Sequence, residues 1–242
     1  MNILAIDFET TGLDVENDRV TEIGAVIYDT ERNKPIRVFN ELVWSDSYPQ
    51  LTQEVIDING ITMQDLKRFA KKPEEVWPKL HAAIKQFPIV MAHNGFGFDF
   101  PILKAELTRV ALDMPKFQAI DSGLDIPFPN HIFTRKLAHL AAEHGFANPF
   151  SHRAVFDVCT MLKIASGYNW DELIERSKFP VLKVIARVSF QEKDRPKSQG
   201  FYWNRDKKEW VRYIRECDLQ KLSFDFPTER KSVDVGEWGG NT

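Results

Sequence analysis

The amino-acid sequence predicts an α/β fold in which a mixed β-sheet is flanked by helices. Two observations support this prediction: three strand-like segments come first along the chain, and a short apolar strand followed by several helical segments comes after them. Strands of this kind, combined with later strand–helix units, are typical of a mixed sheet covered by helices. The chain has 242 residues, of which 43% are hydrophobic, so it can bury a substantial core.

The strands are predicted from apolar runs that end at turn residues. Four such runs cover residues 2–8, 20–29, 36–44 and 89–92. Turn residues around Asn17 and around Asn33 separate the first three runs. We therefore expect these three strands to form an antiparallel meander.

The helices are predicted from apolar residues spaced three or four positions apart. Four such segments cover residues 73–87, 101–112, 134–144 and 154–165. In the first of them Pro73 suits the first turn of a helix. Pro78 is harder to place, because proline removes a hydrogen bond from a helix interior.

Charge divides the chain into two parts. Residues 1–177 contain 18 basic and 25 acidic residues, whereas residues 178–242 contain 14 basic and 10 acidic ones. Aromatic residues are interleaved with the basic ones in the second part: Phe201, Tyr202, Trp203, Trp210 and Tyr213. We therefore predict a main domain of residues 1–177 and a small α+β accessory domain of residues 178–242. The basic face of the accessory domain either binds a polyanion such as nucleic acid or is only solvated.

The sequence also carries expectations about the compartment. No apolar run approaches the roughly 20 residues that cross a bilayer, and the N-terminus lacks the features of a signal peptide. Cys159 and Cys217 lie far apart, which supports neither a disulfide framework nor a thiolate zinc site. We expect a cytoplasmic protein without a membrane partner.

Two carboxylates close to each other end the first predicted strand, in the segment "IDFETTG". Asp7 and Glu9 are two positions apart, so their side chains point to the same side of a strand. Two like charges this close repel each other, so one is protonated, both face water, or a cation binds between them. Alternatively, the strand has already ended and both residues belong to a solvent-exposed turn.

Three further residues extend this pattern. Asp99, in "AHNGFGFDFPIL", stands at the start of a predicted helix, where a capping role is the simplest interpretation. His152 and Asp157 are five positions apart, which is about 140° around a helix, so they cannot share a helix face. We expect His152 on a loop and Asp157 on the following helix. Taken alone, His152 is an ordinary loop histidine.

Together, these segments resemble the three exonuclease motifs of the DEDDh, or DnaQ-like, 3′-to-5′ exonucleases. That superfamily includes the epsilon proofreading subunit of DNA polymerase III, exonuclease X, ribonuclease T and oligoribonuclease. The matching motifs are Asp7-Phe-Glu9-Thr-Thr-Gly12, Asn94-x4-Asp99 and His152-x4-Asp157, supported by "EIGAV" at 22–26 and "NGIT" at 59–62. The resemblance covers roughly residues 1–170 and implies a ribonuclease H-like fold with a mixed five-stranded sheet.

The resemblance also implies a metal site. Its four carboxylates would bind two Mg²⁺ or Mn²⁺ ions that clamp the attacking and leaving oxygens of a phosphodiester: Asp7, Glu9, Asp99 and Asp157. By the same resemblance, Asp7 bridges the two ions and Asp99 helps to hold the second. His152 matches the general base of the family, a role that suits histidine at neutral pH.

Weaker implications concern the terminal nucleotide of the substrate. The resemblance places six residues around it: Phe8, Thr10, Thr11, Gly12, Asn94 and Phe96. For Phe8 and Phe96, burial in the core is an equally good interpretation. Asn94 precedes Asp99 by five positions, as in the exonuclease I type. In the epsilon-type pattern the spacing is usually four positions. Asp121, in "AIDSGLD", stands where relatives often have Asp-Thr-Leu, so we expect it to have a supporting or structural role only.

The second part of the chain has a resemblance of its own. Residues 188–214 are similar to a small module that follows some DnaQ-like exonucleases and occurs in other DNA-metabolism proteins. Six residues match it: Lys197, Gly200, Phe201, Trp203, Lys208 and Trp210. Residues 204–207 fit the turn of a β-hairpin. We expect one of Trp203 and Trp210 to belong to the core and the other to stack on a base of a single strand.

We therefore predict a metal-dependent exonuclease that acts on DNA, with single strands favoured, and releases 5′-mononucleotides. The alternative is a ribonuclease of the oligoribonuclease or ribonuclease T kind. A binding protein without catalysis is disfavoured, because every metal and base position of the motifs is filled. A polymerase or another replication or repair protein is a possible partner.

Overall fold

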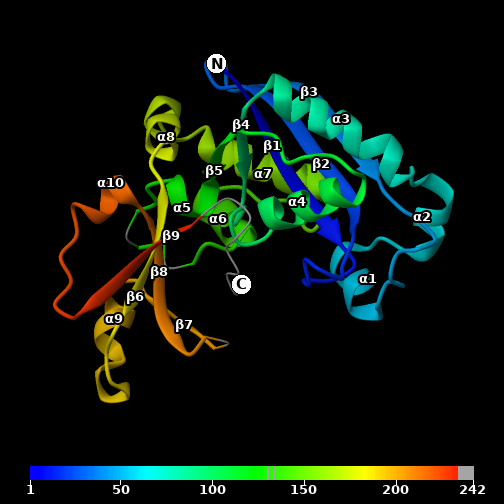
Figure 1. Ribbon diagram of the computed structural model, residues 1–242. Coiled ribbons are helices and arrows are strands. Elements are labelled where there is room, and N and C mark those ends of the chain that lie inside the picture. The colour runs from blue at the N-terminus through cyan, green and yellow to red at the C-terminus, as the bar shows by residue number, and fades with distance from the viewer. Residues whose placement is uncertain (130, 133, 206, 234–242) are drawn as a thin grey trace.

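The computed structural model describes residues 1–129, 131–132, 134–205 and 207–233, which form two β-sheets next to each other (Figure 1). The first sheet has five strands in the order β3-β2-β1-β4-β5, and the second has four in the order β7-β8-β6-β9. Residues 234–242 of the predicted accessory domain lie outside the described residues. Every described helix is too short or too polar to cross a bilayer.

The first sheet is mixed, as the sequence predicted. Its strands are β1 (Asn2–Thr10), β2 (Val20–Asp29), β3 (Lys34–Leu42), β4 (Ile89–Ala92) and β5 (Gln118–Asp121). β2 is antiparallel to both β1 and β3, which is the predicted meander. β4 is parallel to β1, and β5 is parallel to β4. The apolar pattern alone had not indicated β5.

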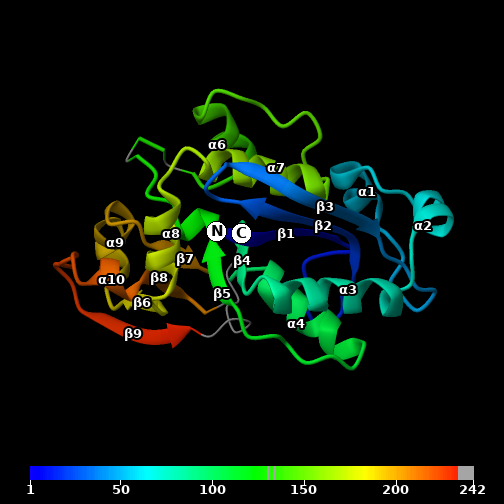
Figure 2. The same ribbon diagram turned by 90° about the horizontal axis from the view of Figure 1, so that it is seen from above.

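Helices cover both faces of this sheet (Figure 2). The helices of this part of the chain are α1 (Gln53–Asn59), α2 (Met63–Phe69), α3 (Pro73–Gln86), α4 (Asp99–Arg109), α5 (Ser122–Asp125), α6 (Leu137–Glu143), α7 (Ala154–Ala165) and α8 (Trp170–Ser177). α3 and α4 pack on one face of the sheet and α7 on the other. The four predicted helices correspond to α3, α4, α6 and α7, and their ends agree to within three residues. α3 continues through Pro78. The four short helices α1, α2, α5 and α8 have no predicted counterpart.

The alternation of side chains along β1 divides the core into two layers. Leu4 and Ile6 point to the face on which α3 and α4 pack. Ile3 and Ala5 point to the opposite face, on which α7 packs. Because side chains alternate along a strand, Asp7 and Glu9 continue the α7 face.

The second sheet is formed by the basic, aromatic part of the chain. Its elements are β6 (Val181–Ala186), η1 (Phe190–Glu192), α9 (Asp194–Ser198), β7 (Tyr202–Asn204), β8 (Glu209–Arg215), α10 (Glu216–Leu219) and β9 (Thr228–Val233). β7 and β8 form the predicted hairpin, in which Trp203 is opposite Trp210. The sheet has a small core of its own around Phe201 and Phe226. In addition, Val181, Tyr213 and Val233 pack against the core of the first sheet.

Candidate active site

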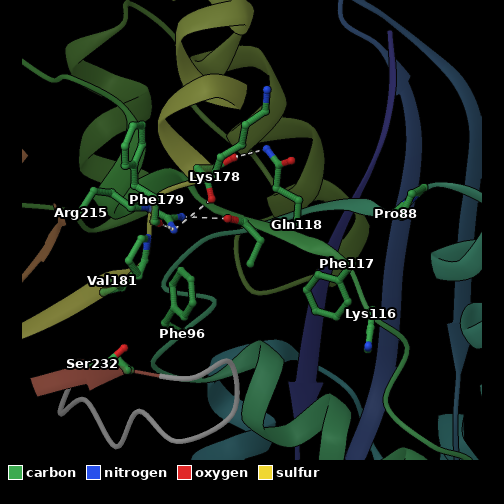
Figure 3. A pocket seen from close by; sticks show the side chains of 14 residues that line it. Pro88, Phe96, Lys116, Phe117, Gln118, Lys178, Phe179, Val181, Arg215 and Ser232 are labelled. Atoms are coloured by element: carbon green, nitrogen blue, oxygen red, sulfur yellow. Dashed lines mark hydrogen bonds between the residues drawn. The ribbon is translucent and has the colours of Figure 1, made fainter. Parts of the chain in front are cut away.

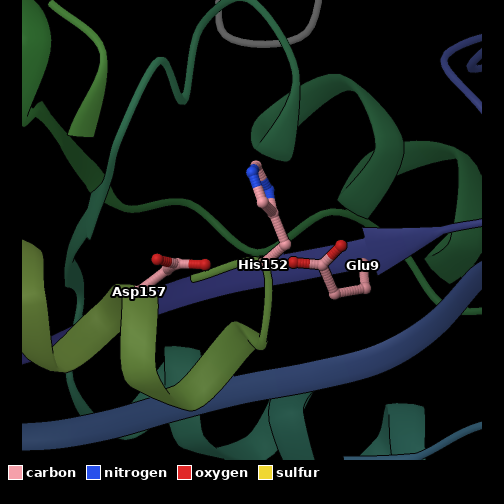
Figure 4. A group of neighbouring side chains, drawn as sticks. All are labelled: Glu9, His152 and Asp157. Atoms are coloured by element: carbon pink, nitrogen blue, oxygen red, sulfur yellow. The ribbon is translucent and has the colours of Figure 1, made fainter. Parts of the chain in front are cut away.

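Asp7 and Glu9 lie at the carboxyl-terminal end of β1, on the face that α7 covers. Glu9, His152 and Asp157 each offer one oxygen or nitrogen atom, and these atoms lie within 4.8 Å of one another (Figure 4). His152 is exposed and lies on the loop before α7, and Asp157 lies in the first turn of that helix. The structure therefore brings the first and third motifs together at the end of β1.

A buried carboxylate on β2 holds the start of α7. Glu22 is fully buried and accepts hydrogen bonds from Arg153 Nη2 at 2.8 Å and from the Ala154 backbone N–H at 3.0 Å. Arg153 Nε donates to the same carboxylate at 3.1 Å. Glu22 belongs to the segment "EIGAV", whose resemblance to the family did not indicate this role. The signal was present, because an acidic residue inside an apolar strand needs a buried partner.

Close backbone packing fixes the same helix on the strand. A Cβ atom at Gly24 would lie 2.4 Å from backbone atoms of Ala154 and Val155, so only glycine allows this approach. His152 precedes the helix with φ at 60°, a left-handed conformation that is uncommon for residues other than glycine. The contact at Gly24 and the anchor at Glu22 together determine where His152 and Asp157 lie relative to β1.

Asp99 completes the set of carboxylates from another direction. It is the first residue of α4, and 2% of its surface is exposed. The capping position belongs to Phe98, so the interpretation of Asp99 as a helix cap is wrong. Its Oδ1 atom has no hydrogen-bond partner among the described residues. A buried carboxylate oxygen in this state is suited to bind a cation.

Burial and mutual repulsion raise the pKa values of these carboxylates. The pKa of Asp7 lies well above its ordinary value, first because of burial and then because of Asp99 and Glu9. The pKa of Glu9 is raised to about 8 by burial and by the charge of Asp157. Burial also raises the pKa of Asp99 and of Asp157. The cluster therefore retains protons that a bound cation would displace.

The donor atoms fit hard divalent cations. Four carboxylates supply oxygen ligands, which Mg²⁺ and Mn²⁺ prefer. A cation among them would neutralise the repulsion that raises the pKa of Asp7 and Glu9. The residues present at this site thus fit the metal ions that the motifs imply.

Asp121 supports the turn that leads to Asp99. Its carboxylate accepts hydrogen bonds from the backbone N–H groups of Asn94 at 3.1 Å and of Phe96 at 3.2 Å. Burial and the nearby Asp125 raise the pKa of Asp121 to about 6, and the backbone hydrogen bonds oppose this shift. Asp121 therefore has the supporting role expected from the sequence.

The other residues expected around the terminal nucleotide fall into two groups. Thr10 ends β1, and Thr11 and Gly12 follow it in a segment that is held by a hydrogen bond of 2.7 Å from Thr11 Oγ1 to Asp18. Phe8 and Phe96, in contrast, are buried in the core. Their rings pack edge-on against Trp77 and Phe100, respectively, so the structure favours the core interpretation for both.

The two tryptophans of the second sheet differ in exposure. Trp203 is 45% exposed, whereas Trp210 packs against the core of the second sheet. Their ring centroids lie 5.6 Å apart, and both line a pocket of about 350 Å³ together with Arg187 and Lys208. Aromatic and basic side chains therefore share this pocket with the acidic Glu209, and base stacking by Trp203 stays a prediction.

Comparison with known proteins identifies the family. The exonuclease family model, RNase_T, matches residues 4–165. The chain belongs to this exonuclease family. The DNA polymerase III subunit epsilon of Treponema pallidum is 32% identical over 167 residues, which cover 66% of this chain and 73% of that protein. The PolC-type DNA polymerase III of Ureaplasma parvum is 26% identical over 169 residues, but the match covers only 11% of that protein.

Solved exonuclease structures share the fold. The zinc-bound complex of E. coli exonuclease I with single-stranded DNA has a TM-score of 0.63 and 18% identity, and the match covers 77% of this chain and 48% of that one. E. coli exonuclease I in complex with a dA16 oligonucleotide has a TM-score of 0.62 and 17% identity. The chain thus spans about half the length of these exonucleases. The predicted ribonuclease H-like fold and the resemblance to DnaQ-like exonucleases are confirmed.

Proposed function

We propose that this protein is a DEDDh-type 3′-to-5′ exonuclease that removes 5′-mononucleotides from the 3′ end of DNA, with single strands favoured. The observation that supports this proposal best is the convergence of Asp7, Glu9, Asp157 and His152 at the end of β1, with Asp99 beside them. Exonucleases of this family use divalent metals, and the carboxylates fit such ions. We propose two Mg²⁺ or Mn²⁺ ions, held by Asp7, Glu9, Asp99 and Asp157.

When bound, such ions would activate a water molecule and stabilise the leaving oxygen of the phosphodiester. His152 is exposed at the tip of its loop, where a ring nitrogen can take the proton of the attacking water. Glu22 and Arg153 keep this loop close to Glu9, so that the base and the ligands stay in register. The segment of Thr10, Thr11 and Gly12 would frame the terminal nucleotide.

The choice of substrate rests on the relatives and on the second sheet. The relatives include a DNA polymerase III subunit, and exonuclease I has been solved with DNA oligonucleotides. A polymerase is therefore a candidate partner. The proposed accessory domain of residues 178–242 would hold the substrate strand, with Trp203 stacking on a base and Arg187 or Lys208 near the phosphates.

Digestion of end-labelled DNA and RNA of equal sequence, with and without Mg²⁺, tests this proposal. We expect a ladder that shortens from the 3′ end of single-stranded DNA, and no digestion after chelation. Faster digestion of RNA would favour the ribonuclease alternative. Absence of digestion of both polymers by the folded protein with Mg²⁺ or Mn²⁺ would contradict the proposal.

Two substitutions test the role of the second sheet. Trp203→Ala should weaken the binding of single-stranded DNA by about 1 to 3 kcal/mol, because an exposed stacking surface is lost. Trp210→Ala should instead lower the melting temperature, because this ring packs on the core. Fluorescence anisotropy with a labelled oligonucleotide and thermal unfolding measure the two effects. Unchanged DNA binding in both folded variants would mean that the basic face is only solvated.

A further inference from the structure

Arg215, at the end of β8, reaches out of the second sheet and into the first. Its side chain is 3% exposed, and the guanidinium binds Asp125 with two hydrogen bonds of 2.7 Å, from Nε and from Nη2. The remaining donors bind backbone carbonyls: Nη2 that of Ala119 at 2.8 Å, and Nη1 those of Phe179 at 2.8 Å and Ser177 at 3.2 Å. The arginine therefore ties the second sheet to β5 (Figure 3).

Asp125 passes this connection on to Asp121. It is fully buried, and its Oδ2 atom accepts a hydrogen bond of 2.9 Å from the Asp121 backbone N–H, in addition to the one from Arg215. Asp125 also lies 4.0 Å from Arg176, which pairs mainly with Asp218. A buried carboxylate depends on such partners, because an unpaired charge is costly to bury.

Asp121 in turn holds the turn that positions Asp99. The backbone N–H groups of Asn94 and Phe96 both donate to its carboxylate. Arg215 also contacts this turn directly, because its guanidinium carbon lies 5.3 Å from the centroid of the Phe96 ring. Two independent contacts therefore connect Arg215 to the segment directly before Asp99.

The start of α4 is held by backbone hydrogen bonds of the turn before it, from the Phe98 N–H to the Asn94 carbonyl at 3.0 Å and from the Phe100 N–H to the Gly95 carbonyl at 2.8 Å. Phe98, at the capping position, makes no side-chain capping hydrogen bond. Asp99 has one carboxylate oxygen without a hydrogen bond among the described residues. The location of its carboxylate therefore depends on the turn before it, to which Asp121 and Arg215 add support from outside.

We propose that Arg215 is a positioning residue for the metal site: through Asp125 and Asp121, the second sheet fixes the place of Asp99. This inference rests on the proposed function only in that Asp99 is a metal ligand. Residues that do not bind the metal themselves can orient the residues that do. Loss of such an orienting residue typically weakens metal binding by about 10- to 100-fold.

Three variants of the full chain test this inference. Arg215→Lys keeps the charge but removes the bidentate hydrogen bonding to Asp125. The double variant Arg215→Met, Asp125→Asn removes both charges, so that no buried carboxylate is left unpaired. Arg212→Met is the matched control, because Arg212 lies on the same strand but donates to the Gln199 carbonyl within the second sheet.

Binding of Mn²⁺, measured by electron paramagnetic resonance, is the first readout and needs no turnover. We expect the dissociation constant to rise about tenfold in both Arg215 variants and to stay unchanged in the control. The second readout is hydrolysis of the p-nitrophenyl ester of dTMP, a single nucleotide without a strand for the second sheet to hold. The Mg²⁺ concentration for half-maximal rate should rise in parallel and kcat should fall, while KM changes less than twofold.

The outcomes separate the inference from the proposed function. Wild-type Mn²⁺ affinity in either Arg215 variant, with a normal circular dichroism spectrum, would show that Arg215 only packs the two sheets together. A wild-type protein that binds Mn²⁺ but hydrolyses no phosphodiester would contradict the proposed function and leave the positioning effect measurable. A wild-type protein that binds no Mn²⁺ would overturn both.

Discussion

A guanidinium paired with a buried carboxylate lies behind each of the second and third motifs, and the two pairs differ in origin. At α7, a guanidinium and a buried carboxylate meet within the region that the family model matches, since Arg153 binds Glu22. At α4, the support of Asp99 leads through Asp125 to Arg215, which lies outside that region. On our proposal, one half of the candidate active site is supported from inside the region that the family model matches, and the other half from the second sheet.

This difference shows that the ligands and their support need not come from the same part of a chain. All five residues of the candidate metal and base set lie within residues 4–165. A comparison based on this region finds those residues but misses the buried arginine behind one of them. Substitutions at α7 and substitutions on the Asp99 side should thus have different effects on hydrolysis, metal binding and stability.

The largest effect should come from Asp7, because its carboxylate lies close both to Asp157 of α7 and to Asp99 of α4. Asp7→Asn should abolish hydrolysis, because it removes a ligand that the two proposed ions share. The melting temperature of the metal-free protein should stay the same or rise, since burial and then the charges of neighbouring carboxylates raise the pKa of Asp7 and disfavour its charged form. A gel assay at saturating Mg²⁺ and thermal unfolding measure both effects. Activity close to wild type would contradict the two-metal assignment.

The next effect isolates the α7 side. His152→Ala should lower kcat by about 10²- to 10⁴-fold if His152 is the general base. Part of this loss should return at high pH, where hydroxide is abundant, while Mn²⁺ binding changes little. Rates from pH 6 to pH 10 provide the measurement. A small loss at every pH would reduce His152 to a loop residue.

The anchor of α7 should respond differently to loss of its two partners. Arg153→Met leaves Glu22 buried without its main partner and should cost about 3 kcal/mol of stability. Glu22→Gln should cost less, about 1 kcal/mol, because Arg153 is partly exposed and can be solvated. Urea unfolding gives both values. Equal costs would show that desolvation of Glu22 is not the main contribution.

The smallest effect is a dependence of stability on pH and metal. The pKa of Glu9 is raised from 4.5 to about 8, so the metal-free folded protein binds a proton that the unfolded chain has lost in this range. The free energy of unfolding should therefore fall as the pH rises from about 4.5 to about 8. Mg²⁺ should raise the melting temperature more at pH 8 than at pH 6.

Glu9→Gln is the control for this dependence, because glutamine cannot titrate. It should flatten the decline of the melting temperature with pH in the presence of a chelator. An equally steep decline in the variant would assign the effect to other groups.

The sequence predicted those parts of the fold and site that depend on nearby residues. Apolar periodicity was sufficient for α3, α4 and α7, and alternation along β1 placed Asp7 beside Glu9. β5 was missed by this approach, because only two of its four residues are apolar, whereas the equally short β4 is apolar throughout. The family motifs supplied the fifth strand and the ligand set.

The supporting pairs could not be predicted in this way. Arg153 and Glu22 are 131 positions apart, and Arg215 and Asp125 are 90 positions apart, so only the folded chain brings them together. The charge of each buried acid was a signal that some partner exists, but it did not identify the partner. The burial of Phe8 likewise depends on Trp77, which belongs to a distant segment of the chain.

The distance along the chain between Asp125 and Arg215 has a consequence for folding during synthesis. A ribosome makes the carboxylate 90 residues before its partner, so the acid stays unpaired until β8 has emerged. Chains generally fold as they are synthesised, with N-terminal parts first. We expect the turn before Asp99 to become ordered late, as one of the last steps. A nascent chain would then carry the motifs of a nuclease before it has the arrangement of one.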